Sequence, residues 1–204
     1  MASGESTRAF EKSPLYLYDD PDYTIVFEDE EIKVHGRVIG PQSDFFKALI
    51  RSQLKESQTK FIPLPEMELQ HVVVALNWMY RVPLEPHNLF SQGAAKELQG
   101  ILETFRFLQI KDAAGEYFKS IDKSLRGIGG KTGHMSSTNI DSIIIQVNEI
   151  YRAGGSVTKK ALDRMVQSVY RGSLSTRFAG VLENLPDPDV RCFRDIMLAV
   201  MRVR

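Results

Sequence analysis

The chain has 204 residues, with 26 basic and 26 acidic side chains and a single cysteine, Cys192. This length predicts one domain, or one domain with a helical extension, and a core of substantial size. The balanced charge argues against recruitment of nucleic acid or an anionic membrane by net charge. One cysteine excludes an intrachain disulfide.

The first residues of the chain are expected to contribute little to the core. Residues 1–14 are polar and lack the apolar segment of a signal peptide, and no window approaches the roughly 18 apolar residues of a membrane span. We therefore expect an intracellular protein of the nucleus or cytoplasm with no membrane association. Small, polar and mixed-charge residues predict that 1–20 forms a disordered or loosely packed tail.

The chain from 22 to 50 changes its hydrophobic period. A β-branched and aromatic run over 23–27 predicts a strand, and alternation over 31–36 predicts a second strand that completes a hairpin. Gly40 and Pro41 predict a break after the short apolar step at 38–39. Ser43 then offers an N-cap for a helix with apolar residues at helical spacing.

The middle of the chain carries one more strand and three helices. Residues 60–64 predict a short strand that lies at a sheet edge, because Pro63 cannot donate a ladder hydrogen bond. A helix is expected over 66–80, with a continuous apolar stripe and His71 on its polar side. A long connection over 83–99 leads to a pair of helices that ends near residue 125.

The last third of the chain is expected to be helical. Glycine-rich residues 126–136 predict a linker, and 137–204 a helical extension. Within the extension, Thr158 is expected to cap one helix, and the final helix is expected to begin near Val190. Four arginines make this final helix basic, which favours a solvated face over a nucleic-acid patch.

The order of these parts resembles the BTB/POZ domain, and most closely the small BTB proteins of filamentous fungi. The residues that match the family pattern, in order, are Asp22, Ile25, Val26, Ile32, His35, Val38, Ile39, Ser43, Phe45 and Phe46. The resemblance implies an α+β fold over 21–125, with a small mixed sheet capped by helices and followed by the helical C-terminal extension. It also implies that His35 orders the turn from strand to helix, and that the protein binds other proteins.

Three residues, Leu54, Lys55 and Glu56, carry the sharpest functional signal. They lie where cullin-binding members of the family have an apolar residue, any residue and a glutamate. The resemblance implies that Leu54 enters a cullin pocket and that Glu56 accepts hydrogen bonds at its rim. It thus predicts a substrate adaptor of a cullin-type ubiquitin ligase. The alternative is an oligomerising scaffold or a transcriptional regulator without a ligase role.

Other family uses and other chemistries are less well supported. The co-repressor pocket of BTB transcription factors pairs the strand aspartate, here Asp22, with a basic residue directly after the histidine, but position 36 is glycine. We expect a monomer or a weak dimer, because only residues 15–18 could exchange between chains.

No pattern in the chain indicates an enzyme. The Gly130-Lys131-Thr132 triplet lacks the upstream glycine of a phosphate-binding loop, since position 125 is leucine, and it is better explained as linker. The four histidines lack metal-ligand spacing, and no nucleophile signature appears. We therefore expect no catalytic residue, no metal and no cofactor.

Overall fold

The structure of the protein is a computed structural model. It describes residues 20–28, 30–89, 91, 93–127, 137–169, 180–181, 184–185 and 187–203. Nearly all of the predicted tail at 1–20 and most of the predicted linker at 126–136 lie outside the described residues. The chain divides into two compact units, the first formed by Met1–Leu84 and Gly100–Ala114, and the second by Glu85–Gln99 and Gly115–Arg204.

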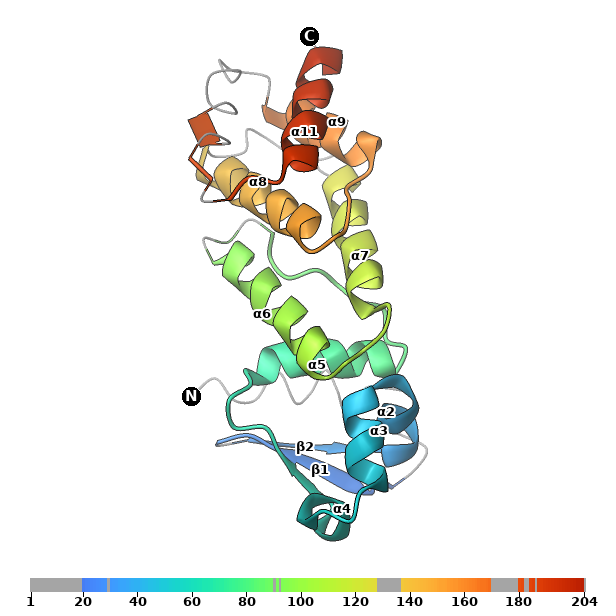
Figure 1. The fold of residues 1–204 in the computed structure, drawn as a ribbon. Coiled ribbons are helices and arrows are strands. Elements are labelled where there is room, and N and C mark those ends of the chain that lie inside the picture. Colours follow the sequence, from blue (N-terminus) through green and yellow to red (C-terminus); the bar gives the residue numbers. More distant parts are fainter. Residues whose placement is uncertain are drawn as a thin grey trace. The chain divides into compact units, whose positions relative to one another are not determined.

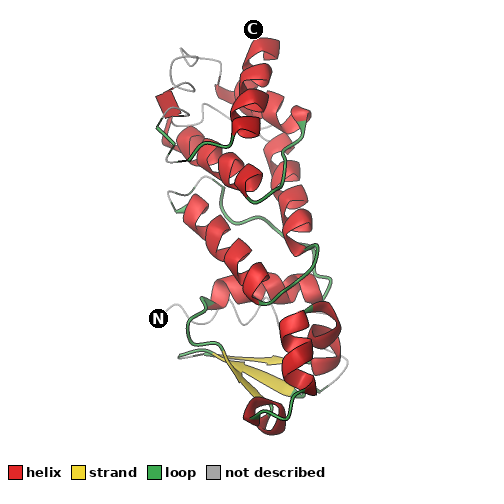
Figure 2. Cartoon of the chain, viewed as in Figure 1, coloured by secondary structure: helices red, strands yellow, loops and turns green. Residues whose placement is uncertain are grey.

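The first unit contains a three-stranded mixed sheet (Figures 1 and 2). Its strands are β1 (Tyr23–Val26), β2 (Glu31–Val34) and β3 (Phe61–Pro63), in the order β2-β1-β3. β1 pairs antiparallel with β2 and parallel with β3. The predicted hairpin and the predicted edge position of the third strand are both confirmed. Alternate side chains face the core, as the period of 2 requires.

Among the described residues, the helices of the first unit include α2 (Gly36–Gln42), α3 (Asp44–Arg51), α4 (Lys55–Thr59), α5 (Leu69–Met79) and the part of α6 (Ala94–Phe107) that begins at Gly100. The break predicted at Gly40 and Pro41 is wrong, because both residues lie inside α2. A Cβ at Gly40 would lie 3.2 Å from the Ile50 side chain. The glycine therefore serves close packing of α2 on α3, and the helix ends only at the extended Ser43.

The predicted exposure of His71 is also wrong. Its ring is buried in α5, together with most apolar residues of that helix. A Cβ at Gly100 of α6 would lie 2.2 Å from a ring carbon of His71, so the two helices approach closely at the glycine. Because α6 approaches so closely, it covers the face of α5 that carries His71, and this face had been expected to lie in solvent.

Among the described residues of the second unit, the regular secondary structure is helical. It contains the start of α6, most of α7 (Ala113–Gly127), α8 (Ser137–Arg152), α9 (Lys159–Val169) and α11 (Val190–Val203) (Figure 1). The predicted cap of α9 is confirmed, since the Thr158 hydroxyl accepts a hydrogen bond from Ala161 N at 3.3 Å. The final helix begins at Val190, as predicted.

A buried polar network joins three segments of the second unit. His87 Nδ1 lies 2.8 Å from the Tyr117 hydroxyl, and His87 Nε2 lies 2.9 Å from Gln146 Oε1. The amide nitrogen of Gln146 donates to the Leu89 carbonyl at 2.8 Å. Burial raises the pKa of Tyr117 to about 12, so the phenol stays protonated.

Two glycines of the second unit have opposite surroundings. A Cβ at Gly155 would lie 2.5 Å from the Phe118 ring, whereas a Cβ at Gly115, inside α7, would meet no heavy atom within 4 Å. We expect Gly155→Ala to destabilise the unit by about 1–3 kcal/mol through overpacking. Gly115→Ala should stabilise it by about 0.5–1 kcal/mol through helix propensity.

Urea unfolding followed by circular dichroism measures both free energies. Because the two substitutions add the same methyl group to the same unit, each serves as the control of the other. Equal shifts in the two variants would contradict the packing described around Gly155.

Candidate protein-interaction site

Leu54 is an exposed apolar side chain at the start of a helix. The segment that follows α3 contains α4, and Leu54 is the N-cap residue of that helix. The Leu54 carbonyl accepts hydrogen bonds from Ser57 N at 3.1 Å and Gln58 N at 3.3 Å. The side chain is 60% exposed. Its backbone is therefore fixed while its apolar surface remains available to a partner.

Lys55 and Glu56 form the first turn of α4. Lys55 is exposed and Glu56 is partly buried. A carboxylate in a first helical turn is favourable, because the backbone N–H groups there carry partial positive charge. The Glu56 carbonyl also accepts a hydrogen bond from Lys60 N at 2.9 Å, which closes the helix.

Serine hydroxyls attach α4 to the end of α3. Ser57 Oγ donates to the Ile50 carbonyl at 3.3 Å, and Ser52 Oγ donates to the Leu49 carbonyl at 2.7 Å. Ser52 Oγ also accepts a hydrogen bond from Leu54 N at 3.2 Å. These contacts set the direction in which Leu54 leaves the chain.

At its other end, α4 is tied to the sheet through Lys60. This residue has a left-handed backbone, with φ of 65°, and leads directly into β3. Its ammonium group lies 2.9 Å from the Tyr23 hydroxyl and 4.4 Å from the centroid of the Tyr23 ring. The serine hydrogen bonds therefore hold the start of α4, and the hydrogen bond and cation–π contact of Lys60 hold its end.

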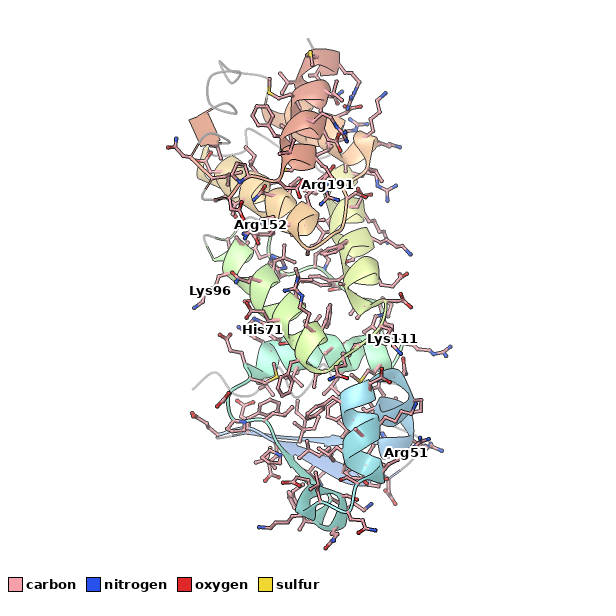
Figure 3. All side chains as sticks on the ribbon, in the orientation of Figure 1. Arg51, His71, Lys96, Lys111, Arg152 and Arg191 are labelled. Atoms are coloured by element: carbon pink, nitrogen blue, oxygen red, sulfur yellow. The ribbon has the colours of Figure 1, made fainter. Side chains whose placement is uncertain are left out.

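A second partly exposed feature was not expected from the sequence. The rings of Phe45 in α3 and Phe107 at the end of α6 lie 5.1 Å apart, and Phe107 is 49% exposed. The Asp44 carboxylate forms an ion pair at 3.1 Å with Lys111, and Lys111 is labelled in Figure 3. Phe107 lies outside the apolar stripe that the buried residues of α6 form. Its position in the sequence could therefore have predicted that its ring is exposed.

Between Phe45 and Leu54, the exposed side of α3 is partly apolar. Ala48 is exposed and Leu49 is partly exposed, whereas Phe46 is completely buried. We call the surface formed by Phe45, Ala48, Leu49, Leu54 and Phe107 the α3 surface. Its residues come from α3, from the N-cap of α4 and from the end of α6.

The motif aspartate and the glycine after the motif histidine are in contact. Asp22 Oδ1 accepts a hydrogen bond from Gly36 N at 2.7 Å, which satisfies the first N–H group of α2. A Cβ at Gly36 would lie 2.7 Å from the Tyr23 ring. Position 36 therefore has no room for the basic side chain that a co-repressor pocket uses.

His35 is buried and makes two hydrogen-bonding contacts with the hydroxyl of Tyr80. The Tyr80 hydroxyl accepts from His35 N at 2.8 Å and lies 2.8 Å from His35 Nδ1. Both contacts are satisfied when the hydroxyl donates its own hydrogen to Nδ1. The predicted ordering of the strand-to-helix turn by His35 is consistent with these contacts.

Ser43 connects the start of α3 to the end of α6. Its hydroxyl accepts from Phe46 N at 3.1 Å, as an N-cap residue does, and donates to the Leu108 carbonyl at 2.5 Å. The predicted N-cap is confirmed. Because Ser43 and Phe46 are both buried, they position the α3 surface without belonging to it.

Metal-binding clusters and membrane-spanning helices were both sought among the described residues. Among them, no group of three or more His, Cys, Asp or Glu side chains is arranged to hold a metal ion. No described helix is both long enough and apolar enough to cross a bilayer. Burial raises the pKa of the Cys192 thiol to about 12, so the thiolate is disfavoured.

The first unit thus combines a small mixed sheet with a set of helices, and an exposed leucine stands at the start of a short helix. The sequence profile of the BTB/POZ domain matches residues 16–125. The chain belongs to the BTB/POZ domain family, which is a family of protein-interaction domains.

The chain is also similar to proteins of poxviruses. It is 31% identical over 104 residues to Kelch repeat and BTB domain-containing protein 1 of cowpox virus, strain Brighton Red. The identity is 30% to the protein of the same name from ectromelia virus and 29% to Kelch repeat and BTB domain-containing protein A55 of vaccinia virus. Each match covers 51% of this chain and 17% of the relative.

The His35–Tyr80 contact generates a first test of this site. Tyr80→Phe removes the hydroxyl and leaves a buried backbone N–H without its acceptor, so we expect a loss of about 1–3 kcal/mol in the free energy of unfolding. Urea unfolding of the variant and the unchanged protein measures this loss. The control is Thr59→Ala, which removes an exposed hydroxyl and should change stability by less than about 0.5 kcal/mol. A similar value for both variants would show that the buried contact is not maintained.

The exposure of Leu54 generates a second test. Leu54→Ser should change the free energy of unfolding by less than about 0.5 kcal/mol, because the side chain is mostly in solvent. Phe46→Ala, in the adjoining helix, should cost about 3–5 kcal/mol, because it empties a core position. A large loss in Leu54→Ser would mean that Leu54 serves the fold rather than a partner.

Proposed function

We propose that this protein is a BTB adaptor that binds a cullin through the α3 surface, with Leu54 as the anchor. The observation that carries the proposal is the 60% exposure of Leu54 at the start of α4, followed by Glu56 in the first turn. Leu54 would enter an apolar pocket of the cullin, and Glu56 would accept hydrogen bonds at its rim. Lys55, between them, faces solvent and would lie at the edge of the contact.

The size of a stable interface supports the inclusion of the rest of the α3 surface. A specific complex usually buries about 800 Å² on each partner, which one leucine cannot supply. Phe45 and Phe107 add aromatic area, and aromatic residues are enriched among those that dominate binding. The serine contacts of α4 hold Leu54 in place before binding, so less conformational entropy is lost on association.

The rest of the chain would have a separate role in this proposal. The domain division that we propose places the BTB/POZ domain at 21–125, a linker at 126–136 and a helical extension at 137–204. The extension would hold the substrate or add to the cullin-binding surface. The poxviral relatives combine a BTB domain with kelch repeats, as their names state. We further propose that the chain acts in the nucleus or cytoplasm, and that it is similar to the small BTB proteins of filamentous fungi.

Calorimetric titration against a cullin N-terminal domain tests this function. We expect micromolar or tighter binding, which corresponds to about −8 kcal/mol. Leu54→Asp should abolish it, because a charge would enter the pocket, and Glu56→Ala should weaken it. Met201→Asp provides a matched control, because Met201 is 61% exposed but lies in α11 of the second unit.

Two results would contradict the adaptor function. One is a folded chain that shows no binding, and the other is equal binding by Leu54→Asp and the control. Light scattering of the same samples would then test the alternative of a scaffold or regulator that acts through self-association.

A further inference from the structure

The sheet of the first unit ends in a groove. Strands β1 and β3 run parallel, with Val26 opposite Pro63, so the segments that follow them leave the sheet at the same end (Figure 1). The hairpin turn at 27–30 forms one wall of the groove, and residues 65–69, which lead into α5, form the other. The groove has a volume of about 290 Å³ and lies entirely within the first unit.

Backbone hydrogen bonds fix both walls of the groove. Phe27 N donates to the Glu30 carbonyl at 2.9 Å, which closes the hairpin turn. Leu64 N donates to the Val26 carbonyl at 2.8 Å, and Met67 N donates to the Leu64 carbonyl at 3.2 Å. The groove is therefore formed before a partner binds, so less conformational entropy is lost on association.

The lining of the groove is half apolar and half acidic. Its apolar members are Phe27, Pro65, Met67 and Leu69, and its acidic members are Glu28, Glu30, Glu66 and Glu68. Phe27 is buried, and Met67 and Leu69 are partly exposed. Both walls thus bring carboxylates to the rim of an apolar surface.

Most of these carboxylates have no counter-charge within the protein. In the part of the chain that the structure describes, Glu28, Glu30 and Glu66 form no ion pair. Glu68 accepts a hydrogen bond from Gln70 Nε2 at 2.8 Å and lies 3.7 Å from His71 Nε2. A carboxylate just before α5 is favourable for that helix. The helix does not account for the two glutamates of the hairpin, so negative charge remains available to a partner.

We propose that this groove binds a basic peptide segment of a partner protein, with an arginine side chain lying across it. The aliphatic stem of the arginine would cover Met67 and Leu69, as long basic side chains do on apolar surfaces. Its planar guanidinium, with five N–H donors, would bind carboxylates of both walls. The apolar lining and the acidic rim together match a side chain that is apolar along its stem and cationic at its end.

The same two properties argue against other occupants. Among the described residues, no group of three or more His, Cys, Asp or Glu side chains is arranged to hold a metal ion. A neutral apolar peptide would cover the carboxylates without supplying a counter-charge, which is unfavourable. The same groove of a second copy would bring further carboxylates to this site, and like charges across an interface are unfavourable.

The test uses the full chain and a labelled peptide of about ten residues, in which two arginines flank a leucine within a glycine and serine sequence. The reference peptide has citrulline in place of each arginine, which keeps the shape of the side chain and removes its charge. Fluorescence anisotropy measures binding. We expect the arginine peptide to bind at least about tenfold more tightly than the citrulline peptide.

Variants of the lining locate the contact. The double variant Glu28→Gln, Glu66→Gln should weaken binding of the arginine peptide by about tenfold, because one exposed carboxylate alone contributes little. Met67→Gln keeps the length and charge of the side chain but makes it polar, and should weaken binding by about threefold. Glu85→Gln is the matched control, since Glu85 is exposed but does not line the groove, and it should have no effect.

Several outcomes would overturn the proposal. They are equal binding of the two peptides, unchanged binding by the double variant, and an equal loss in the double variant and Glu85→Gln, which would show that net charge alone attracts the peptide. Calorimetric binding of calcium chloride that the double variant abolishes would assign the groove to a metal ion instead. The proposal does not rest on the cullin contact, because Leu54→Asp should leave peptide binding unchanged.

Discussion

The first unit depends on one buried contact, between His35 and the hydroxyl of Tyr80. The chain turns from β2 into α2 at His35, so a backbone N–H is buried where neither ladder nor helix can pair it. Tyr80 supplies the missing acceptor from the end of α5, which fixes the helical layer on the sheet. The second unit uses the same arrangement, in which His87 meets the Tyr117 hydroxyl through its backbone N–H and Nδ1.

From that connection follows the position of the α3 surface. α2 leads into Ser43, whose hydroxyl both caps α3 and reaches the end of α6, so Phe45 and Phe107 meet. The buried Phe46 then orients α3 with its apolar side inward, and Leu54 emerges where that helix has ended. The buried residues that stabilise the unit and the exposed residues of the α3 surface are therefore different side chains of the same segment.

Exposed apolar side chains occur in two forms in this protein. In the first unit, Leu54 projects singly from a short helix that polar contacts hold at both ends. In the second unit, exposed Val190, Phe193 and Met201 lie along α11, and the buried residues of that helix occupy the neighbouring side. Exposed apolar area of either kind is removed from water only when another surface covers it.

The sequence by itself determined the elements whose signals are local. The alternation over the hairpin, the Ser43 cap, the edge position of Pro63 and the start of the final helix were all read from neighbouring residues. Local hydrogen bonding and side-chain periodicity impose those features. The placement of residues outside the described ranges, including most of the predicted linker, stays a prediction.

Only the tertiary structure decided which faces are covered. His71 looks exposed in its own helix, but Gly100 of a distant helix lets α6 approach and bury it. Gly40 looks like a breaker, but it serves the packing of Ile50 against α2. Phe45 and Phe107 are far apart in the sequence, so no local pattern shows that their rings meet. Burial is a property of pairs of segments, and a single segment does not contain the partner that covers it.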